Sequence, residues 1–277
     1  MSSASDGYEA LSSGAAWLDL RARGRIVARG RDRVRFLHNI TSNEVKKMAP
    51  GSSCYAFLLS PQGRIQADLH LVCFADRFLI DTEPELREKV PRHILKYKVA
   101  DQVELEDVTE QTAAIGVEGP AAESIVLAPG EHSVAPFTVT GQAGYRVYCA
   151  AADMARLVEQ IERAGARPAT LEDARTVRIE NGKPVYGEDI RETSLPQETG
   201  QMQAVSFSKG CYIGQEIVER IRAMGQVRRK LERIALDGAE PAAAGSRVTV
   251  AGREAEITSS VYSPRLGKAI ALAYVRV

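Results

Sequence analysis

Apolar residues recur at helical spacing in several segments of this chain. The clearest lies in residues 152–166, where Met154, Leu157, Ile161 and Ala164 fall on one face of an amphipathic helix and Gly165 marks its end. A second helix is predicted from Thr170 and Asp173, which resemble a capping box, to about Glu180. Shorter helical patterns occupy residues 34–45, residues 84–99 with a break or kink at Pro91, and residues 120–128.

Between the helical patterns, the chain is rich in β-forming residues. The runs 54–60 and 64–74 are separated by Pro61, Gln62 and Gly63, which predicts a β-hairpin. Further strands are predicted at 77–80, 102–108 and 112–119, and another hairpin at 137–150. Strands mixed with segregated helices indicate an α+β fold.

After residue 226 the pattern becomes entirely β. The segments 227–238, 246–252, 253–264 and 268–277 alternate apolar and polar residues and are separated by Gly- and Pro-containing turns. We therefore predict a domain boundary near Gln226, with a first domain at 1–226 and a small C-terminal β-barrel or sandwich at 227–277.

Charge and composition exclude some classes of partner. The chain has 277 residues, of which 36 are Lys or Arg and 36 are Asp or Glu, so its global charge favours neither nucleic acid nor an anionic membrane. Asp6 and Glu9 stand where a signal peptide needs positive charge, and no apolar run is long enough to span a bilayer. We expect a cytoplasmic monomer.

The four cysteines have no spacing typical of a zinc site, and the four histidines have no ligand spacing either. No metal site is therefore predicted. Cys54, Cys73 and Cys149 lie in apolar runs and are expected to be structural. Cys211 differs because it lies in the segment KGCYIGQE, where Lys209 is close and glycines allow a tight turn. A nearby cation lowers the pKa of a thiol, so Cys211 is either a reactive thiolate or an inert core residue.

Two carboxylates also stand out. Asp68 lies inside a predicted strand, where aspartate is disfavoured, so we expect it either to contact a ligand or act in acid–base catalysis, or else to bond to a nearby loop. Glu180 ends a predicted helix, where it either faces solvent or accepts paired hydrogen bonds from a planar heterocycle such as a pterin. The basic residues Arg220, Arg222, Arg228, Arg229 and Lys230 either bind an anionic tail or are simply solvated.

Together, these segments carry a family likeness. KGCYIGQE resembles the signature of the YgfZ-type proteins, folate-dependent factors that support iron–sulfur cluster assembly or repair. RDRVRFLHNITSNEV, SPQGRIQADL, RIENGKPVYGEDI with LPQE, and ITSSVYSPRLGKAIALAYV are similar to the wider superfamily that includes the aminomethyltransferase, or T-protein, of the glycine cleavage system. The likeness covers nearly the whole chain, and the cysteine motif is its specific part.

This resemblance implies a T-protein-like folate-binding fold with a small C-terminal β-barrel. It implies that Glu180 binds the pterin of tetrahydrofolate or a one-carbon derivative, that Arg178 and Tyr186 support that pocket, and that downstream arginines such as Arg229 meet the glutamate tail. Asp68 falls where T-proteins carry an Asp-Asp pair, but Ala67 fills the other position.

Two functions follow from the resemblance, and a third, a folate-binding regulatory module without chemistry, stays open. The first is a tetrahydrofolate-binding accessory factor for iron–sulfur proteins or their assembly factors, with Cys211 as its thiol. The alternative is a folate-dependent one-carbon transferase with Asp68 as its acid or base. Because KGCYIGQE is present and the second acidic residue is missing, the sequence favours the first. Whether the protein is an enzyme is left open.

Overall fold

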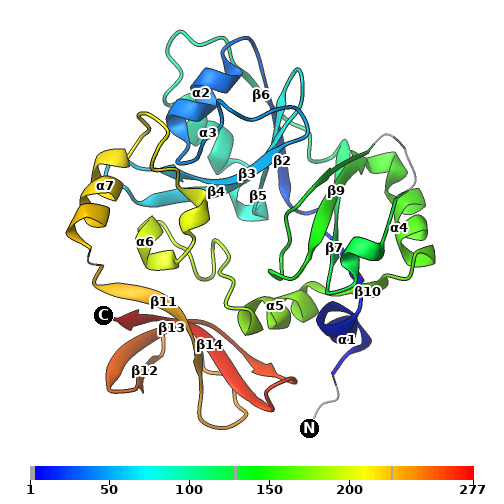
Figure 1. Cartoon of the computed structure of the whole chain (residues 1–277), viewed down its shortest axis with the longest axis vertical. Coiled ribbons are helices and arrows are strands. Elements are labelled where there is room, and N and C mark those ends of the chain that lie inside the picture. The colour runs from blue at the N-terminus through cyan, green and yellow to red at the C-terminus, as the bar shows by residue number, and fades with distance from the viewer. Residues whose placement is uncertain (1–3, 128–129, 131, 226) are drawn as a thin grey trace. The chain divides into compact units, whose positions relative to one another are not determined.

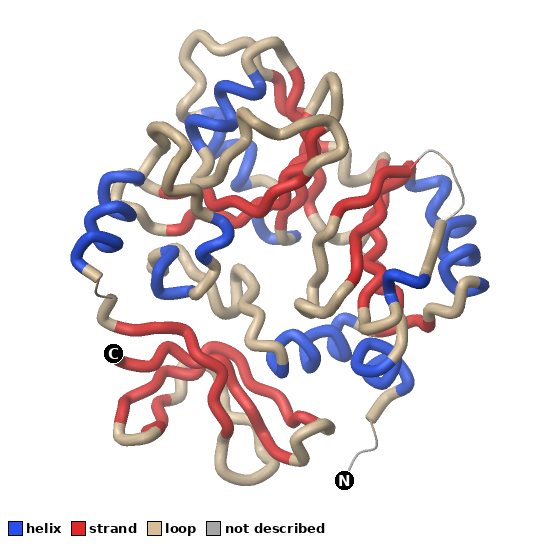
Figure 2. Tube along the Cα trace, viewed as in Figure 1, coloured by secondary structure: helices blue, strands red, loops and turns tan. Residues whose placement is uncertain are grey.

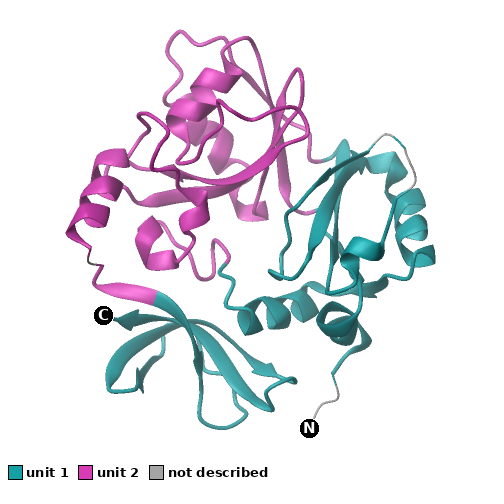
Figure 3. Cartoon of the chain, in the orientation of Figure 1, with its two compact units in different colours: residues 1–21, 110–184, 231–276 teal, residues 22–109, 185–230, 277 magenta. Residues whose placement is uncertain are grey.

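The structure is a computed structural model, and it describes residues 4–127, 130, 132–225 and 227–277 (Figure 1). Helices are interspersed among runs of consecutive strands along this part of the chain (Figure 2). The chain forms two compact units (Figure 3), which we call unit 1 (Met1–Arg21, Glu110–Pro184 and Leu231–Arg276) and unit 2 (Ala22–Thr109, Val185–Lys230 and Val277).

Unit 2 is built on a five-stranded antiparallel sheet. Its order is β3-β4-β5-β2-β6, with bounds Ser53–Leu59 (β3), Ile65–Cys73 (β4), Phe78–Thr82 (β5), Gly24–Arg29 (β2) and Glu104–Asp107 (β6). Successive side chains of a strand point to opposite faces of a sheet. In β4, Ala67, Leu69 and Leu71 therefore face the hydrophobic core, and Asp68 lies on the other face.

The predicted hairpin at 54–74 is confirmed. Phe57 pairs with Asp68 across β3 and β4, and the backbone N–H of Gly63 donates to the carbonyl of Ser60 at 2.8 Å to close the turn. Gly63 has φ 71°, a left-handed conformation that glycine adopts without strain.

Helices of unit 2 cover the apolar face of this sheet, namely α2 (Arg33–Ile40), η1 (Pro84–Leu86), α3 (Lys89–Leu95), η4 (Met202–Ala204) and α7 (Gln215–Met224). The short helix α6 (Pro196–Thr199) contacts α7 and η4. Phe36, Leu37, Ile94 and Val218 from these helices join the core. The pattern at 84–99 is split as predicted, but the break precedes Lys89 and Pro91 lies in the first turn of α3, where proline is tolerated.

Unit 1 contains a second five-stranded sheet. Its order is β10-β1-β7-β9-β8, with bounds Arg167–Ala169 (β10), Ala16–Asp19 (β1), Thr112–Glu118 (β7), Gly144–Ala150 (β9) and His132–Ala135 (β8). Only β1 and β10 pair in parallel among the described strands of this sheet. Leu157 and Ile161 of α4 (Met154–Arg163), the predicted amphipathic helix, pack into its core, and η3 (Ala151–Asp153) precedes that helix.

The rest of unit 1 joins two helices to a C-terminal sheet. That sheet has the order β11-β14-β13-β12, with bounds Arg229–Ala235 (β11), Lys268–Arg276 (β14), Arg253–Ser263 (β13) and Arg247–Val250 (β12). Next to α1 (Asp6–Ser13) lies α5 (Leu171–Glu180), whose capping box between Thr170 and Asp173 is present as predicted. Ile179 of α5 packs against Val261, Ile270 and Leu272 of the sheet.

Some predictions were wrong. Residues 120–128 form only η2 (Ala122–Ser124) in the described residues, because Ile125 turns to an extended conformation as it packs into the core of unit 1. Of the hairpin predicted at 137–150, only the second strand, β9, is present in the described chain. Its partner is β8, which lies before residue 137, and Val134 of β8 pairs with Val147 of β9. The helix α7 was not predicted, and the boundary expected near Gln226 lies outside the described residues.

Candidate functional site

Asp68 lies on the polar face of the sheet in unit 2, and within the described chain one of its two carboxylate oxygens is bonded. The phenol of Tyr55, in β3, donates a hydrogen bond of 2.9 Å to Oδ2. Oδ1 is buried and accepts no hydrogen bond from the described part of the chain. Because a buried polar atom without a partner is costly, an unbonded carboxylate oxygen in a strand is a candidate for ligand contact.

Burial raises the pKa of Asp68 to about 7, since water no longer stabilises the charged form. The negative charge of Glu83 adds to the rise in pKa, while Arg23 and the hydrogen bond from Tyr55 oppose it. A carboxyl group with such a pKa is both a competent acid and a competent base at neutral pH.

The charges near Asp68 form a buried ion-pair network. Nε of Arg23 lies 2.6 Å from Oδ1 of Asp81, and its Nη1 binds Oε1 of Glu83. Asp81 is fully buried and Arg23 nearly so. The guanidinium of Arg23 is thereby fixed between two acids on one side of the sheet.

Tyr186, predicted to support the pterin pocket, lies in unit 2 beside the same strand. Its hydroxyl donates to the carbonyl of Gln66 at 2.9 Å and accepts from Nζ of Lys89 at 3.1 Å. Nζ of Lys89 also donates to the carbonyl of Gln66 at 2.6 Å. Gln66 precedes Asp68 by two residues, so this cluster fixes the backbone of β4 beside the acidic group.

Glu180, the predicted pterin ligand, lies in unit 1 and is buried rather than facing solvent. Its Oε1 accepts hydrogen bonds from the hydroxyl of Tyr8 at 2.8 Å and from that of Ser263. Oε2 lies 3.5 Å from Nε of Arg265. Arg178 is also buried and donates to the carbonyl of Lys183 at 3.1 Å. The carboxylate is therefore held in place by its own unit, and its contact with a pterin stays a prediction.

Lys209 has a structural role in KGCYIGQE. Nζ donates to the carbonyls of His38 and Thr41 at the C-terminal end of α2, and it lies 5.0 Å from the centre of the Tyr212 ring. Burial lowers the pKa of Lys209 to about 8. Gly214 has φ 82° and begins α7, whereas Gly210 lies outside the left-handed region. The tight turn that the sequence suggested around Cys211 therefore belongs to Gly214.

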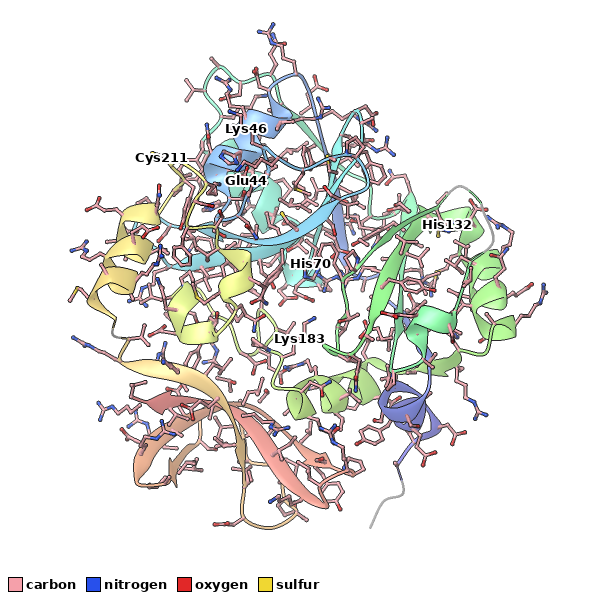
Figure 4. The ribbon with its side chains drawn as sticks, in the orientation of Figure 1. Glu44, Lys46, His70, His132, Lys183 and Cys211 are labelled. Carbon is pink, nitrogen blue, oxygen red and sulfur yellow. The ribbon has the colours of Figure 1, made fainter. Side chains whose placement is uncertain are left out.

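Cys211 itself is exposed, while Cys73 and Cys149 are buried. It lines a hollow of about 510 Å³ in unit 2, together with Arg35, His38, Asn39, Lys46, Gly210, Tyr212 and Ile213. Cys211 and Lys46 are labelled together in Figure 4 beside α2. Burial, and then the nearby Lys209 cation, lowers the pKa of His38 in this hollow.

Arg229, predicted to meet a glutamate tail, forms an ion pair within unit 2. Its Nε lies 3.2 Å from Oε1 of Glu198. Arg220 and Arg222 are exposed, and the guanidinium of Arg222 lies 4.2 Å from the centre of the Phe207 ring. Binding of an anionic tail by these residues stays a prediction.

Within the described ranges, no group of three or more His, Cys, Asp or Glu side chains is arranged to hold a metal ion. Nor does any helix of the described chain have the length and apolar character that crossing a lipid bilayer requires.

Comparison with known proteins identifies the family. The family model described as the GCVT N-terminal domain matches residues 2–209, and the glycine cleavage T-protein C-terminal barrel domain matches residues 229–277. The chain belongs to the glycine cleavage T-protein family. The predicted α+β fold with a small C-terminal barrel domain is confirmed.

Relatives in this family are named aminomethyltransferases. The protein from Rubrobacter xylanophilus is 31% identical over 97% of this chain and 78% of its own length. That from Geobacillus kaustophilus is 31% identical over 99% of this chain and 83% of its own length. A crystal structure of glycine cleavage system aminomethyltransferase T from Bartonella henselae has a TM-score of 0.87 at 18% identity, covering 98% of this chain and 80% of that one, and supports the fold.

The T-protein family uses tetrahydrofolate, the expected cofactor. The predicted superfamily is confirmed, while membership of its YgfZ-type branch and a role with iron–sulfur proteins stay predictions. The names of the relatives agree better with the alternative function, one-carbon transfer.

Proposed function

We propose that this protein is a folate-dependent one-carbon transferase in which Asp68 is the acid–base group. The observation that carries the proposal is the unbonded, buried Oδ1 of Asp68 on a carboxyl group with a pKa of about 7. Tetrahydrofolate would supply the nitrogen atoms that accept a one-carbon unit. Such a transfer needs a group that gives a proton to the departing nitrogen and removes one from the accepting nitrogen.

The residues around Asp68 fit this task. Tyr55 holds Oδ2 with its phenol, so the carboxyl group cannot rotate freely and Oδ1 is the oxygen left to carry or receive a proton. An oxygen that accepts nothing from the residues described in the structure can accept a hydrogen bond from an N–H group of a reduced pterin. Asp68 would therefore both orient the ligand and transfer the proton.

Ala67, in place of the second acidic residue of T-proteins, does not argue against this chemistry. Its side chain is buried in the apolar core of unit 2, on the opposite face of β4 from Asp68. A carboxylate at position 67 would enter that core rather than stand beside Asp68. The absence of this carboxylate leaves the polar face of the sheet intact.

The test is a transfer assay with ¹³C-labelled aminomethyl and N-methyl donors, tetrahydrofolate and mass-spectrometric detection of the labelled folate. We expect Asp68→Asn to lower the rate by about 100-fold or more, the usual contribution of a general acid–base group. Asp76→Asn is the matched control, because Asp76 is an exposed carboxylate of the same unit. Absence of label transfer in the wild type with every donor would refute the proposal.

Glu180 and Arg178 remain our proposed ligands of the pterin, on the basis of the family resemblance. Calorimetric titration with tetrahydrofolate measures this role separately from turnover. Glu180→Gln should weaken binding by about tenfold or more, because the amide cannot accept paired hydrogen bonds with the strength of a charged acceptor. Unchanged affinity would remove Glu180 from the binding site.

A second candidate function, as a thiol-dependent factor for iron–sulfur proteins, is favoured by one observation, the exposure of Cys211 in the hollow beside α2. A complementation experiment distinguishes this thiol-dependent function from the one-carbon transferase. In a strain lacking this protein, Cys211→Ala should fail to restore iron–sulfur enzyme activities while Asp68→Asn restores them. The opposite result would support the transferase.

A further inference from the structure

Glu83 directly follows β5 of unit 2, and its charge acts on Asp68 in the neighbouring strand β4. The antiparallel register pairs His70 of β4 with Asp81 of β5, and the same register continued by two residues brings Glu83 level with Asp68. The hydroxyl of Thr82 donates to the carbonyl of Asp68 at 3.0 Å, which ties the end of β5 to this point of β4. The register and this hydrogen bond place the residue after Thr82 on the side of Asp68.

Glu83 is paired with a cation, whereas no cation of the described residues forms an ion pair with Asp68. Nη1 of Arg23 binds Oε1 of Glu83, and its Nε binds Asp81. The hydrogen bond that the structure gives to the Asp68 side chain comes from the neutral phenol of Tyr55. Since two like charges in a buried site cannot both ionise easily, the proton goes to the carboxyl group that lacks a cationic partner.

We propose that Glu83 is a positioning residue that keeps a proton on Asp68 in the ligand-free protein. Arg23 takes part by binding the carboxylate of Glu83 next to the end of β5. Tyr55 acts in the opposite direction, because its hydrogen bond favours the ionised carboxylate. This inference deepens the proposed transferase function, since it assigns Asp68 as a proton donor at neutral pH.

The other charged and titratable groups near Asp68 do not replace Glu83 in this role. Tyr186 and the amine of Lys89 form their own cluster at the carbonyl of Gln66. The ring of His70, on the same face of β4, lies 5.0 Å from that of Tyr55. Arg25 pairs with Asp81 in the register of β2 and β5 and donates to the carbonyls of Arg23 and Thr109.

The experiment is a carboxyl titration of the ligand-free protein labelled with [4-¹³C]aspartate, with the Asp68 signal assigned by its loss in Asp68→Asn. Glu83→Gln should lower the titration midpoint of Asp68 by on the order of one pH unit, because it removes the like charge and leaves Arg23 freer to stabilise the carboxylate. Tyr55→Phe should raise the midpoint. Asp76→Asn, at the surface, should leave it unchanged.

The two opposite shifts separate an electrostatic role from a merely structural one. Glu83→Met, which also removes the charge, should lower the midpoint in the same way and serves if Glu83→Gln does not fold. An unchanged or raised midpoint in the folded variant would overturn the inference. Because no ligand or turnover is needed, a shifted midpoint in a protein that transfers no label would refute the proposed function and leave the role of Glu83 standing.

Discussion

The phenol of Tyr55 donates its hydrogen bond to Oδ2 of Asp68 from the neighbouring strand, at 2.9 Å. This contact explains how an aspartate persists inside β4. One oxygen is satisfied by the adjacent strand, and the cost of the other is reduced because burial favours the protonated, neutral form. The sheet therefore holds a carboxyl group that gains and loses its proton near neutral pH, rather than a carboxylate that is always charged.

Asp68→Asn should change how the stability of the protein depends on pH. The pKa of Asp68 is raised from 3.8 to about 7 on folding, so between these values the folded state binds more protons than the unfolded state. The free energy of unfolding of the wild type therefore falls as pH rises through this interval, and the asparagine variant lacks this loss. In urea unfolding, the free energy of unfolding of the variant minus that of the wild type should increase by about 2 to 4 kcal/mol between about pH 4 and about pH 8.

Asp76→Asn is the control for this measurement, because Asp76 is exposed and its arginine neighbours lower its pKa. It should not gain stability relative to the wild type as pH rises. Parallel pH curves for Asp68→Asn and the wild type would show that Asp68 ionises normally in the folded protein.

Gly214→Ala should destabilise the protein through backbone strain. Gly214 has φ 82°, and a Cβ atom there would lie 2.5 Å from the carbonyl oxygen of Ser60 in the turn between β3 and β4. Both the left-handed conformation and this clash are costly, so we expect a loss of about 2 to 4 kcal/mol in urea unfolding.

Gly210→Ala is a matched control within the same motif. A Cβ atom at Gly210 meets nothing within 4 Å. The free energy of unfolding should change by less than about 0.5 kcal/mol. If both variants lost the same free energy of unfolding, the left-handed conformation and the clash at Gly214 could not be the cause.

Glu180→Gln should destabilise unit 1 even without a ligand. The glutamine amide can still accept the hydroxyls of Tyr8 and Ser263, but it cannot balance the charge of Arg265. The carboxylate is 1% exposed, so the loss of charge is weakly screened, and we expect a decrease of about 1 to 3 kcal/mol. Glu172→Gln tests the same change on the exposed side of α5 and should have little effect. If Glu172→Gln lowered the free energy of unfolding as much as Glu180→Gln does, the cause would be a change in α5 itself rather than the loss of the buried charge.

The sequence was informative where local rules decide the structure. Pro61 and Gly63 mark the turn of the hairpin, and the capping box of Thr170 and Asp173 fixes the start of α5, because each feature needs only nearby residues. The C-terminal sheet was predictable for the same reason, since each of its strands is bounded by turn residues.

The contacts that make the candidate sites were hidden because they join distant segments. Tyr8 and Glu180 are 172 positions apart, and Arg23 and Glu83 are 60 positions apart. No local pattern pairs them. Tyr55 is the exception. In a hairpin with its turn at 61–63, Tyr55 on the first strand and Asp68 on the second lie at similar distances from the turn, so they are expected to be close. The missed helix α7 begins after Gly214, which suggested a loop rather than a helix start.

Cys211 should be the one cysteine of the folded protein that reacts quickly with an aromatic disulfide reagent. Cys211 is exposed, Cys73 and Cys149 are buried, and burial raises the pKa of Cys54 to about 12, which suppresses its thiolate. Native protein should therefore release about one equivalent of reporter thiolate in the fast phase, and protein unfolded in urea should release the amount expected for all 4 cysteines. Cys211→Ala should abolish the fast phase, whereas Cys73→Ala should keep it. A fast phase that survives in Cys211→Ala would mean that another thiol is the accessible one, and the role of KGCYIGQE would then lie in Lys209 and Gly214, which fix the end of α2 and the start of α7.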